Sequence, residues 1–207
     1  MKKENIVKII STMVVIAIIA IITATSHKNV TGENARTYAC DYKTMNLFNT
    51  KIETVLNGET ITISGNVLRL FTDPLTVKDS NGNVIGNAGD AYGIFKQDDH
   101  GIYIGDKFDV NMCGKFNLIG NSYDIKNAQG EIIATAKFNA FATSGTITDT
   151  NNEIIAVYQK GIFANDYTVT ICDNDVCSDL STLMIMASYV SDYKADSQSS
   201  SSSRSNK

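Results

Sequence analysis

The chain between about residues 51 and 171 alternates apolar and polar residues in short runs. A period of two is typical of β-strands that bury one face. Gly, Asn and Asp separate the runs, and these residues tolerate the backbone angles of tight turns. Because no long helical pattern interrupts the series, it predicts an antiparallel β-sandwich or barrel. The clearest runs are residues 60–64, 67–71, 101–105, 116–119 and 167–171.

One hairpin pattern occurs three times, at residues 77–86, 125–134 and 147–156. In each copy a β-branched residue ends one strand, Asp or Asn opens the turn, and Gly or Asn takes a left-handed position. Two branched aliphatic residues then begin the return strand. The copies are unequally spaced, which argues against a solenoid or propeller with a fixed period. The repeat therefore favours a closed or nearly closed meander.

One clear helix is predicted after the last strand, at residues 178–192, with Ser178 or Asp179 as its N-cap. Apolar side chains cover nearly every face of this helix, so it must be buried on all sides. Because it is too short to cross a bilayer, the interior of the β structure is its natural place. Residues 194–207 are rich in serine and cannot form a core, so we expect a disordered tail.

A targeting segment is predicted at the N-terminus. Lys2, Lys3 and Lys8 precede a charge-free, mostly apolar run at residues 9–26. By the positive-inside rule these lysines keep the N-terminus in the cytoplasm, so the chain from about residue 27 lies outside. The run fits either an uncleaved anchor or a signal peptide cleaved after Ser26. We favour a single-pass cell-membrane protein with an extracytoplasmic domain, and a secreted protein is the alternative.

Four segments follow from these patterns. Residues 1–26 form the hydrophobic anchor or signal peptide, 27–50 a linker that leads into the domain, 51–193 the β domain and 194–207 the tail. The net charge of −4 argues against nucleic acid as a partner, because proteins that bind it present a strongly basic face. The expected partners are the membrane, through the N-terminal segment, and a lipid or a protein.

The order of these elements resembles the LURP-one-related and tubby C-terminal-like superfamily, whose fold is shared with phospholipid scramblases. The likeness covers about residues 60–192. Three stretches carry it: residues 123–133, residues 154–160 followed by 166–171, and the terminal helix. The resemblance implies a closed antiparallel barrel of about twelve strands around the buried hydrophobic C-terminal helix. It also implies membrane tethering and contact with lipid.

The chain has four cysteines, Cys40, Cys113, Cys172 and Cys177. An even number in an exported domain favours disulfides. Cys172 and Cys177 flank a short loop that can bring them opposite each other, and a pair between Cys40 and Cys113 follows by elimination. Buried free thiols are the alternative.

Other candidate chemistry is sparse. Asp98, Asp99 and His100 place two carboxylates beside the one imidazole of the domain, and an exposed hairpin tip is the favoured interpretation of this run. Residues 79–83 superficially resemble the start of a calcium loop, but Val84 stands where such a loop requires glycine. Neither a catalytic residue nor a metal or cofactor site is predicted.

The expected function is therefore that of a non-enzymatic, membrane-anchored, extracytoplasmic β-barrel domain that binds or tethers, with a lipid-related role implied by the resemblance. An exported enzyme of unrecognised type and a secreted structural or interaction protein are the alternatives, so enzyme activity stays an open question. A cluster of acids around His100 facing a cleft would favour the enzyme.

Overall fold

The computed structural model describes residues 34–45, 49–66, 75–90, 99–115, 121–161 and 164–202. The predicted N-terminal segment, the predicted strands at residues 67–71 and 116–119, and Asp98 lie outside these residues.

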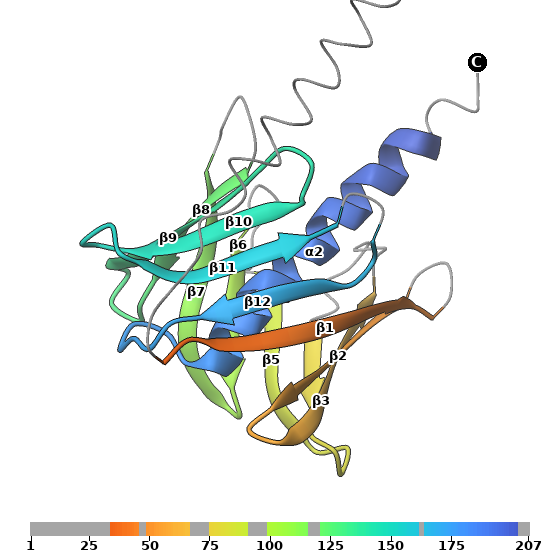
Figure 1. Cartoon of the computed structure of the whole chain (residues 1–207), viewed down its shortest axis with the longest axis horizontal. Helices are drawn as coiled ribbons and strands as arrows, with labels where there is room; N and C mark the ends of the chain where they lie inside the picture. Colours follow the sequence, from red (N-terminus) through yellow and green to blue (C-terminus); the bar gives the residue numbers. More distant parts are fainter. Residues whose placement is uncertain are drawn as a thin grey trace, which may run out of the picture. The chain divides into compact units, whose positions relative to one another are not determined.

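Twelve antiparallel β-strands close into a barrel, which confirms the predicted fold class (Figure 1). Each strand pairs with its neighbours in the sequence, and β1 closes the barrel against β12. The strands are β1 (Arg36–Thr44), β2 (Asn49–Leu56), β3 (Glu59–Asn66), β4 (Leu75–Lys78), β5 (Val84–Asp90), β6 (Asp99–Ile104), β7 (Lys107–Lys115), β8 (Asn121–Lys126), β9 (Ile132–Phe138), β10 (Ser144–Asp149), β11 (Ile154–Lys160) and β12 (Tyr167–Ile171).

The first strand lies within residues 27–50, where the sequence predicts only a linker, so the barrel begins earlier than expected. β1 buries Tyr38, Cys40 and Tyr42 and turns the residues between them outward. This is the period of two that a half-buried strand requires. The inward residues are tyrosines and a cysteine instead of branched aliphatics, which weakens the strand signal in the sequence. The start of the β domain is therefore corrected to Arg36.

The three repeated hairpins share one turn. In the first, Asp79 Oδ1 accepts the backbone N–H groups of Asn81 at 2.9 Å and Asn83 at 2.8 Å. Asn127 and Asp149 accept the equivalent pairs of N–H groups in the other two hairpins. The left-handed position is taken by Gly82, Gly130 and Asn152, with φ of 84°, 81° and 64°. The predicted repeat is confirmed, and the side chain of Asp79 belongs to the turn.

Each repeated hairpin also contains a β-bulge. The pairing register skips one residue in the return strand, and the skipped residue is Ile85, Ile133 or Ile155. All three side chains pack on the hydrophobic core. A bulge turns a side chain out of the regular alternation. The second aliphatic residue of each repeat therefore helps to seal the end of the barrel at which these hairpins turn, called the turn end below.

The helix α2 (Asp179–Ser202) enters the barrel at the turn end and leaves it at the opposite end, called the exit end below (Figure 1). From Leu183 to Val190 every side chain is at most 3% exposed, so the prediction of a buried helix is confirmed. The predicted N-cap is also confirmed, because the N–H of Ser181 donates to Ser178 Oγ at 3.1 Å.

The helix continues beyond the predicted end at Asp192. Its backbone is helical to Ser202, so part of the serine-rich segment that the sequence predicts to be disordered is helical. Lys194, Ala195 and Gln198 favour helix, and serine opposes it only weakly once a helix is already formed.

Aromatic rings join α2 to the wall of the barrel. Tyr189 stacks on Phe138 of β9 with ring centroids 3.5 Å apart and ring planes 10° apart. Tyr123 and Tyr158 meet the Tyr189 ring edge-on, and the Tyr189 hydroxyl donates to the Asn139 carbonyl at 3.4 Å. These contacts fix the rotation of α2 as well as its depth.

Replacement of Gly130 by alanine tests the shared turn. At a φ of 81° the change is strained, and because nothing lies within 4 Å of the added Cβ, the cost comes from the backbone alone. We expect the free energy of unfolding to fall by about 1–2 kcal/mol in urea melts. The matched change Asn152→Gly should leave it unchanged or raise it by up to about 1 kcal/mol. Equal losses in both variants would contradict the shared turn.

Truncation of a buried helix residue tests the packing of α2. Met184 is 0% exposed, so Met184→Ala should lower the free energy of unfolding by about 2–5 kcal/mol through lost burial and a new cavity. The matched control is Met45→Ala, because Met45 is 63% exposed and its loss should change stability by less than about 0.5 kcal/mol. Urea melts give both values, and an unchanged midpoint for Met184→Ala would refute the buried helix.

Candidate functional site

The structure separates the residues of the predicted exposed loop cluster. Asp99 and His100 begin β6, and neighbouring residues of a strand point to opposite faces. Asp99 Oδ1 accepts the backbone N–H of Gly114 at 3.0 Å at the outer face of the wall. His100 is 2% exposed and lies inside the barrel. The prediction that this run forms an exposed hairpin tip is therefore wrong for His100.

His100 meets a carboxylate from the helix instead. Its Nε2 lies 2.8 Å from Asp192 Oδ2, and the two side chains are 2% and 10% exposed. The pair links β6 to α2 at the exit end of the barrel. The sequence does not indicate Asp192 as a partner, because the two residues are far apart in the chain and only the burial of the helix brings them together. No sequence signal near His100 indicates this partner.

A second set of polar contacts holds the other end of α2. The Arg36 guanidinium donates to both oxygens of Asp179, with Nε 2.7 Å from Oδ2 and Nη2 2.9 Å from Oδ1. The hydroxyl of Tyr38 also donates to Asp179. The hydrogen bond from Arg36 holds the pKa of Asp179 below its ordinary value, against the opposing effect of partial burial. The first strand is therefore tied to the first turn of the helix.

The hairpin between β6 and β7 differs from the repeated ones. Its register also skips one residue, but this residue is Asp109 and not an aliphatic. The Asp109 carboxylate accepts a hydrogen bond from the hydroxyl of Ser181 in the first turn of α2. Three of the four bulges thus supply an aliphatic side chain to the turn end, and the fourth supplies a carboxylate that accepts a hydrogen bond.

Neither predicted disulfide is found in the described residues, where all four cysteines are free thiols. Cys40 faces the core from β1, whereas Cys113 lies on β7 at the opposite side of the closed barrel, next to the inward-facing Met112. This geometry does not permit their pairing. Cys177 packs into the core, and Cys172 is half-buried beyond the end of β12. Burial raises the pKa of Cys40 to about 11 and that of Cys177 to about 12, so neither thiol is activated.

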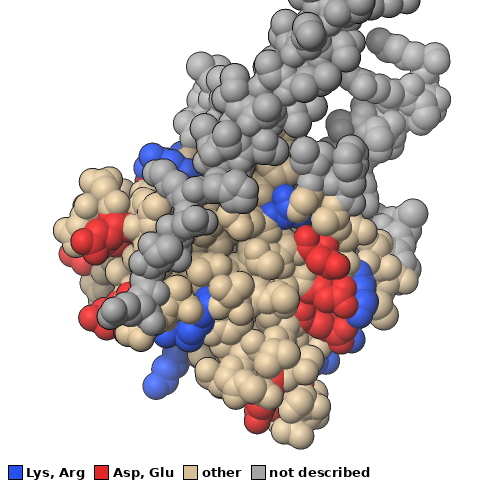
Figure 2. All heavy atoms as spheres, in the orientation of Figure 1, with Lys and Arg blue, Asp and Glu red and all other residues tan. Residues whose placement is uncertain are grey.

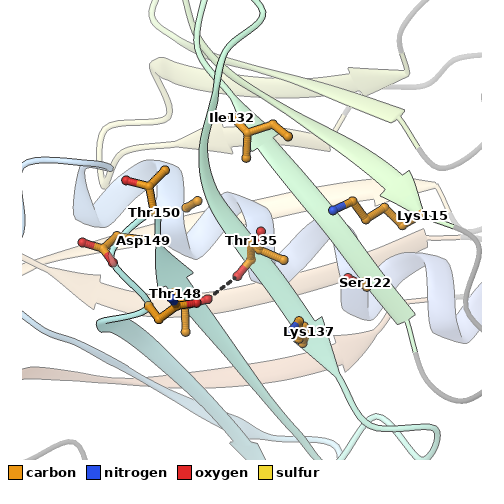
Figure 3. Close-up of a pocket in the computed structure, with 10 residues that line it drawn as sticks. Lys115, Ser122, Ile132, Thr135, Lys137, Thr148, Asp149 and Thr150 are labelled. Atoms are coloured by element: carbon orange, nitrogen blue, oxygen red, sulfur yellow. Dashed lines mark hydrogen bonds between the residues drawn. The ribbon is translucent and has the colours of Figure 1, made fainter.

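A pocket of about 290 Å³ lies on the outer wall of the barrel (Figure 3). Figure 3 shows Thr135 near its centre, Lys115 reaching toward Thr135 from one side, and Asp149 and Thr150 on the other side. Because β7 to β10 are adjacent strands, their outward residues form one continuous rigid surface here. The lining residues are Lys115, Ser122, Ile132, Ala134, Thr135, Lys137, Thr148, Asp149, Thr150 and Asn152.

The charged groups of this outer-wall pocket differ in their partners. Lys115 pairs with Asp124 of β8, whose side chain is 12% exposed. Asp149 is the turn residue of the third repeat, and its Oδ1 already accepts two backbone N–H groups. Lys137 has no carboxylate partner among the described residues and is exposed. The sequence gives no separate signal for the pocket, because polar residues are expected on the outer face of any such strand.

The rest of the visible surface is mixed in charge. Figure 2 shows acidic and basic side chains in small neighbouring groups among a majority of other residues. On the outer face of β1 and β2, Lys43 Nζ lies 2.6 Å from Asp41 Oδ2 and 2.9 Å from Glu53 Oε2. Exposed pairs of this kind add little to stability.

Among the residues that the structure describes, no group of three or more His, Cys, Asp and Glu side chains is placed to hold a metal ion. Within the same residues no helix is both long enough and apolar enough to cross a bilayer, and the predicted N-terminal segment lies outside them. No protein-family model, curated protein or solved structure matches the chain.

A double-mutant cycle tests the His100–Asp192 pair. Because Asp192→Ala leaves a buried imidazole without its carboxylate partner, we expect the free energy of unfolding to fall by about 3 kcal/mol in urea melts. The single variants His100→Leu and Asp192→Leu complete the cycle. The double variant replaces both partners by apolar groups and should cost less than the sum of these two single changes. Strictly additive losses would show that the two side chains are not coupled.

Proposed function

We propose that the chain is a membrane-anchored, non-enzymatic β-barrel domain that acts by binding outside the cytoplasmic membrane. The observation that carries this proposal is the outer-wall pocket, in which polar side chains from four adjacent strands converge on one hollow. Sites built on strands hold their side chains more precisely than sites on loops do. The location rests on the lysines that precede the apolar run at residues 9–26.

The interior of the barrel favours recognition at the outer wall. The buried part of α2, from Leu183 to Val190, occupies the space inside the strands, and its side chains are at most 3% exposed. A ligand therefore has to meet the barrel from outside or at its ends.

The enzyme alternative requires that an acid and a base reach a substrate. The one imidazole–carboxylate pair described, His100 with Asp192, has side chains only 2% and 10% exposed and lies between β6 and α2. A pair at this depth positions the helix. The arrangement thus favours a binding domain over an enzyme.

The resemblance to the LURP-one-related and tubby C-terminal-like superfamily stays part of the proposal. The closed barrel of twelve strands and its buried C-terminal helix agree with the architecture that the resemblance implies. A lipid-related role would bring the domain close to the membrane that its N-terminal segment is proposed to enter.

A protease-accessibility experiment tests the proposed location. The full chain is expressed in cells with a reporter fused to its C-terminus, and protease is added outside the intact cells. We expect the reporter to be digested, because the charge rule places everything after the apolar run outside. A reporter fused to a cytoplasmic protein in the same cells serves as the control for cell integrity. A protected C-terminal reporter would overturn the proposed location.

The mass of the mature chain then distinguishes the two forms of the proposal. A product that retains Met1 is an anchored protein, whereas one that begins at His27 has lost a signal peptide and is secreted.

A further inference from the structure

The size of the outer-wall pocket limits its ligand. Its volume of about 290 Å³ is at the lower end of the range of about 300–1,000 Å³ that is typical of small-molecule sites. Such sites are usually lined by apolar side chains, but Ile132 is the one large apolar residue in this lining. The pocket therefore fits a small polar molecule or one unit of a polar polymer.

The uncharged groups of the lining suit hydroxyls. Ser122, Thr135 and Thr150 bring hydroxyl groups, and Asn152 brings an amide. Such groups both donate and accept hydrogen bonds, as the hydroxyl groups of a ligand do. The hydroxyl of Thr148 already donates a hydrogen bond to the Thr135 carbonyl at 3.4 Å. This bond joins β10 to β9 at the centre of the pocket.

The charged groups of the lining favour an anion. The lining contains two ammonium groups, Lys115 and Lys137, and one carboxylate, Asp149. Lys115 pairs with Asp124 of β8, and Asp149 accepts the N–H groups of its own turn. Lys137 is exposed and has no carboxylate partner among the described residues, so it is the ammonium group of the lining that remains to meet an anion. An anionic group at the lysine side and hydroxyl groups at the other side would complement the pocket.

We infer that the outer-wall pocket binds one acidic sugar unit of a polymer that lies outside the cell, with its carboxylate toward Lys137. The hydroxyl groups of the sugar then face the hydroxyl and amide side chains of the lining. This inference rests on the proposed function, because the proposed location determines which polymers the domain can reach.

Ligand-observed NMR on the purified full chain in detergent micelles tests the inference. Saturation-transfer signals are recorded for galacturonate, and galactose serves as the neutral sugar of the same shape. We expect galacturonate to bind more tightly than galactose, and added salt to weaken its binding, because one exposed ammonium–carboxylate contact is made. Lys137→Gln should weaken galacturonate binding about tenfold through the loss of this charge-assisted contact.

Two further variants make the test specific to the pocket. Lys78→Gln removes an exposed lysine from β4, away from the pocket, and should leave galacturonate binding unchanged. Thr135→Val removes a hydroxyl at nearly constant shape and should weaken both sugars a few-fold. Urea melts of Lys137→Gln and Thr135→Val confirm that each variant is folded.

Several results would overturn the inference. Equal affinity for galactose and galacturonate would refute recognition of the ligand's carboxylate. An unchanged affinity of folded Lys137→Gln for galacturonate would place the binding site elsewhere. Inorganic phosphate that displaces galacturonate at equal concentration would show a simple anion site without sugar recognition. The reporter experiment is independent, so a cytoplasmic domain whose galacturonate binding depends on Lys137 would refute the proposed location and leave the pocket's chemistry standing.

Discussion

The width of the barrel is the constraint on which the rest of the structure depends. A closed sheet of about eight strands is just filled by its own inward side chains, whereas twelve strands enclose more space than they can fill. An empty interior would forfeit dispersion contacts along every strand. The buried part of α2 supplies the missing volume, so the wall and the helix stabilise each other and neither is complete without the other.

The ends of the barrel show how an apolar helix is held in one position. Apolar contacts have little directional preference, so they fix the depth and rotation of a helix less sharply than polar contacts do. Asp179 with Arg36 at the turn end and Asp192 with His100 at the exit end bond each end of the buried segment to the wall. Between these two ends, the stacking of Tyr189 on Phe138 fixes the rotation of the helix. The bulge residues then close the turn end around the point where the helix enters.

The sequence predicts local structure here better than it predicts long-range contacts. The repeated turns are visible because Asp79, Asn127 and Asp149 act on residues two and four positions later, within one short segment. The burial of α2 is visible because its faces are uniformly apolar. The pairing of His100 with Asp192 is not visible, and neither is the pocket, because both arise only when the barrel closes and brings separate segments together. The disulfide predictions failed because spacing in the chain does not reveal where a cysteine lies in the closed barrel. Cys40 and Cys113 lie on opposite sides of it, and Cys177 packs into the core whereas Cys172 is only half-buried.

The barrel closes when β1 pairs with β12, and α2 follows β12 directly. The domain can therefore fold only late in synthesis. The first strand has an open edge until the last strand is available, and the helix that fills the core is synthesised after both. Contacts of this kind join residues that are distant in the chain and form slowly. The chain therefore stays without its native core until α2 has been synthesised. An unfolded chain of this kind is the form that can be threaded through a narrow membrane channel.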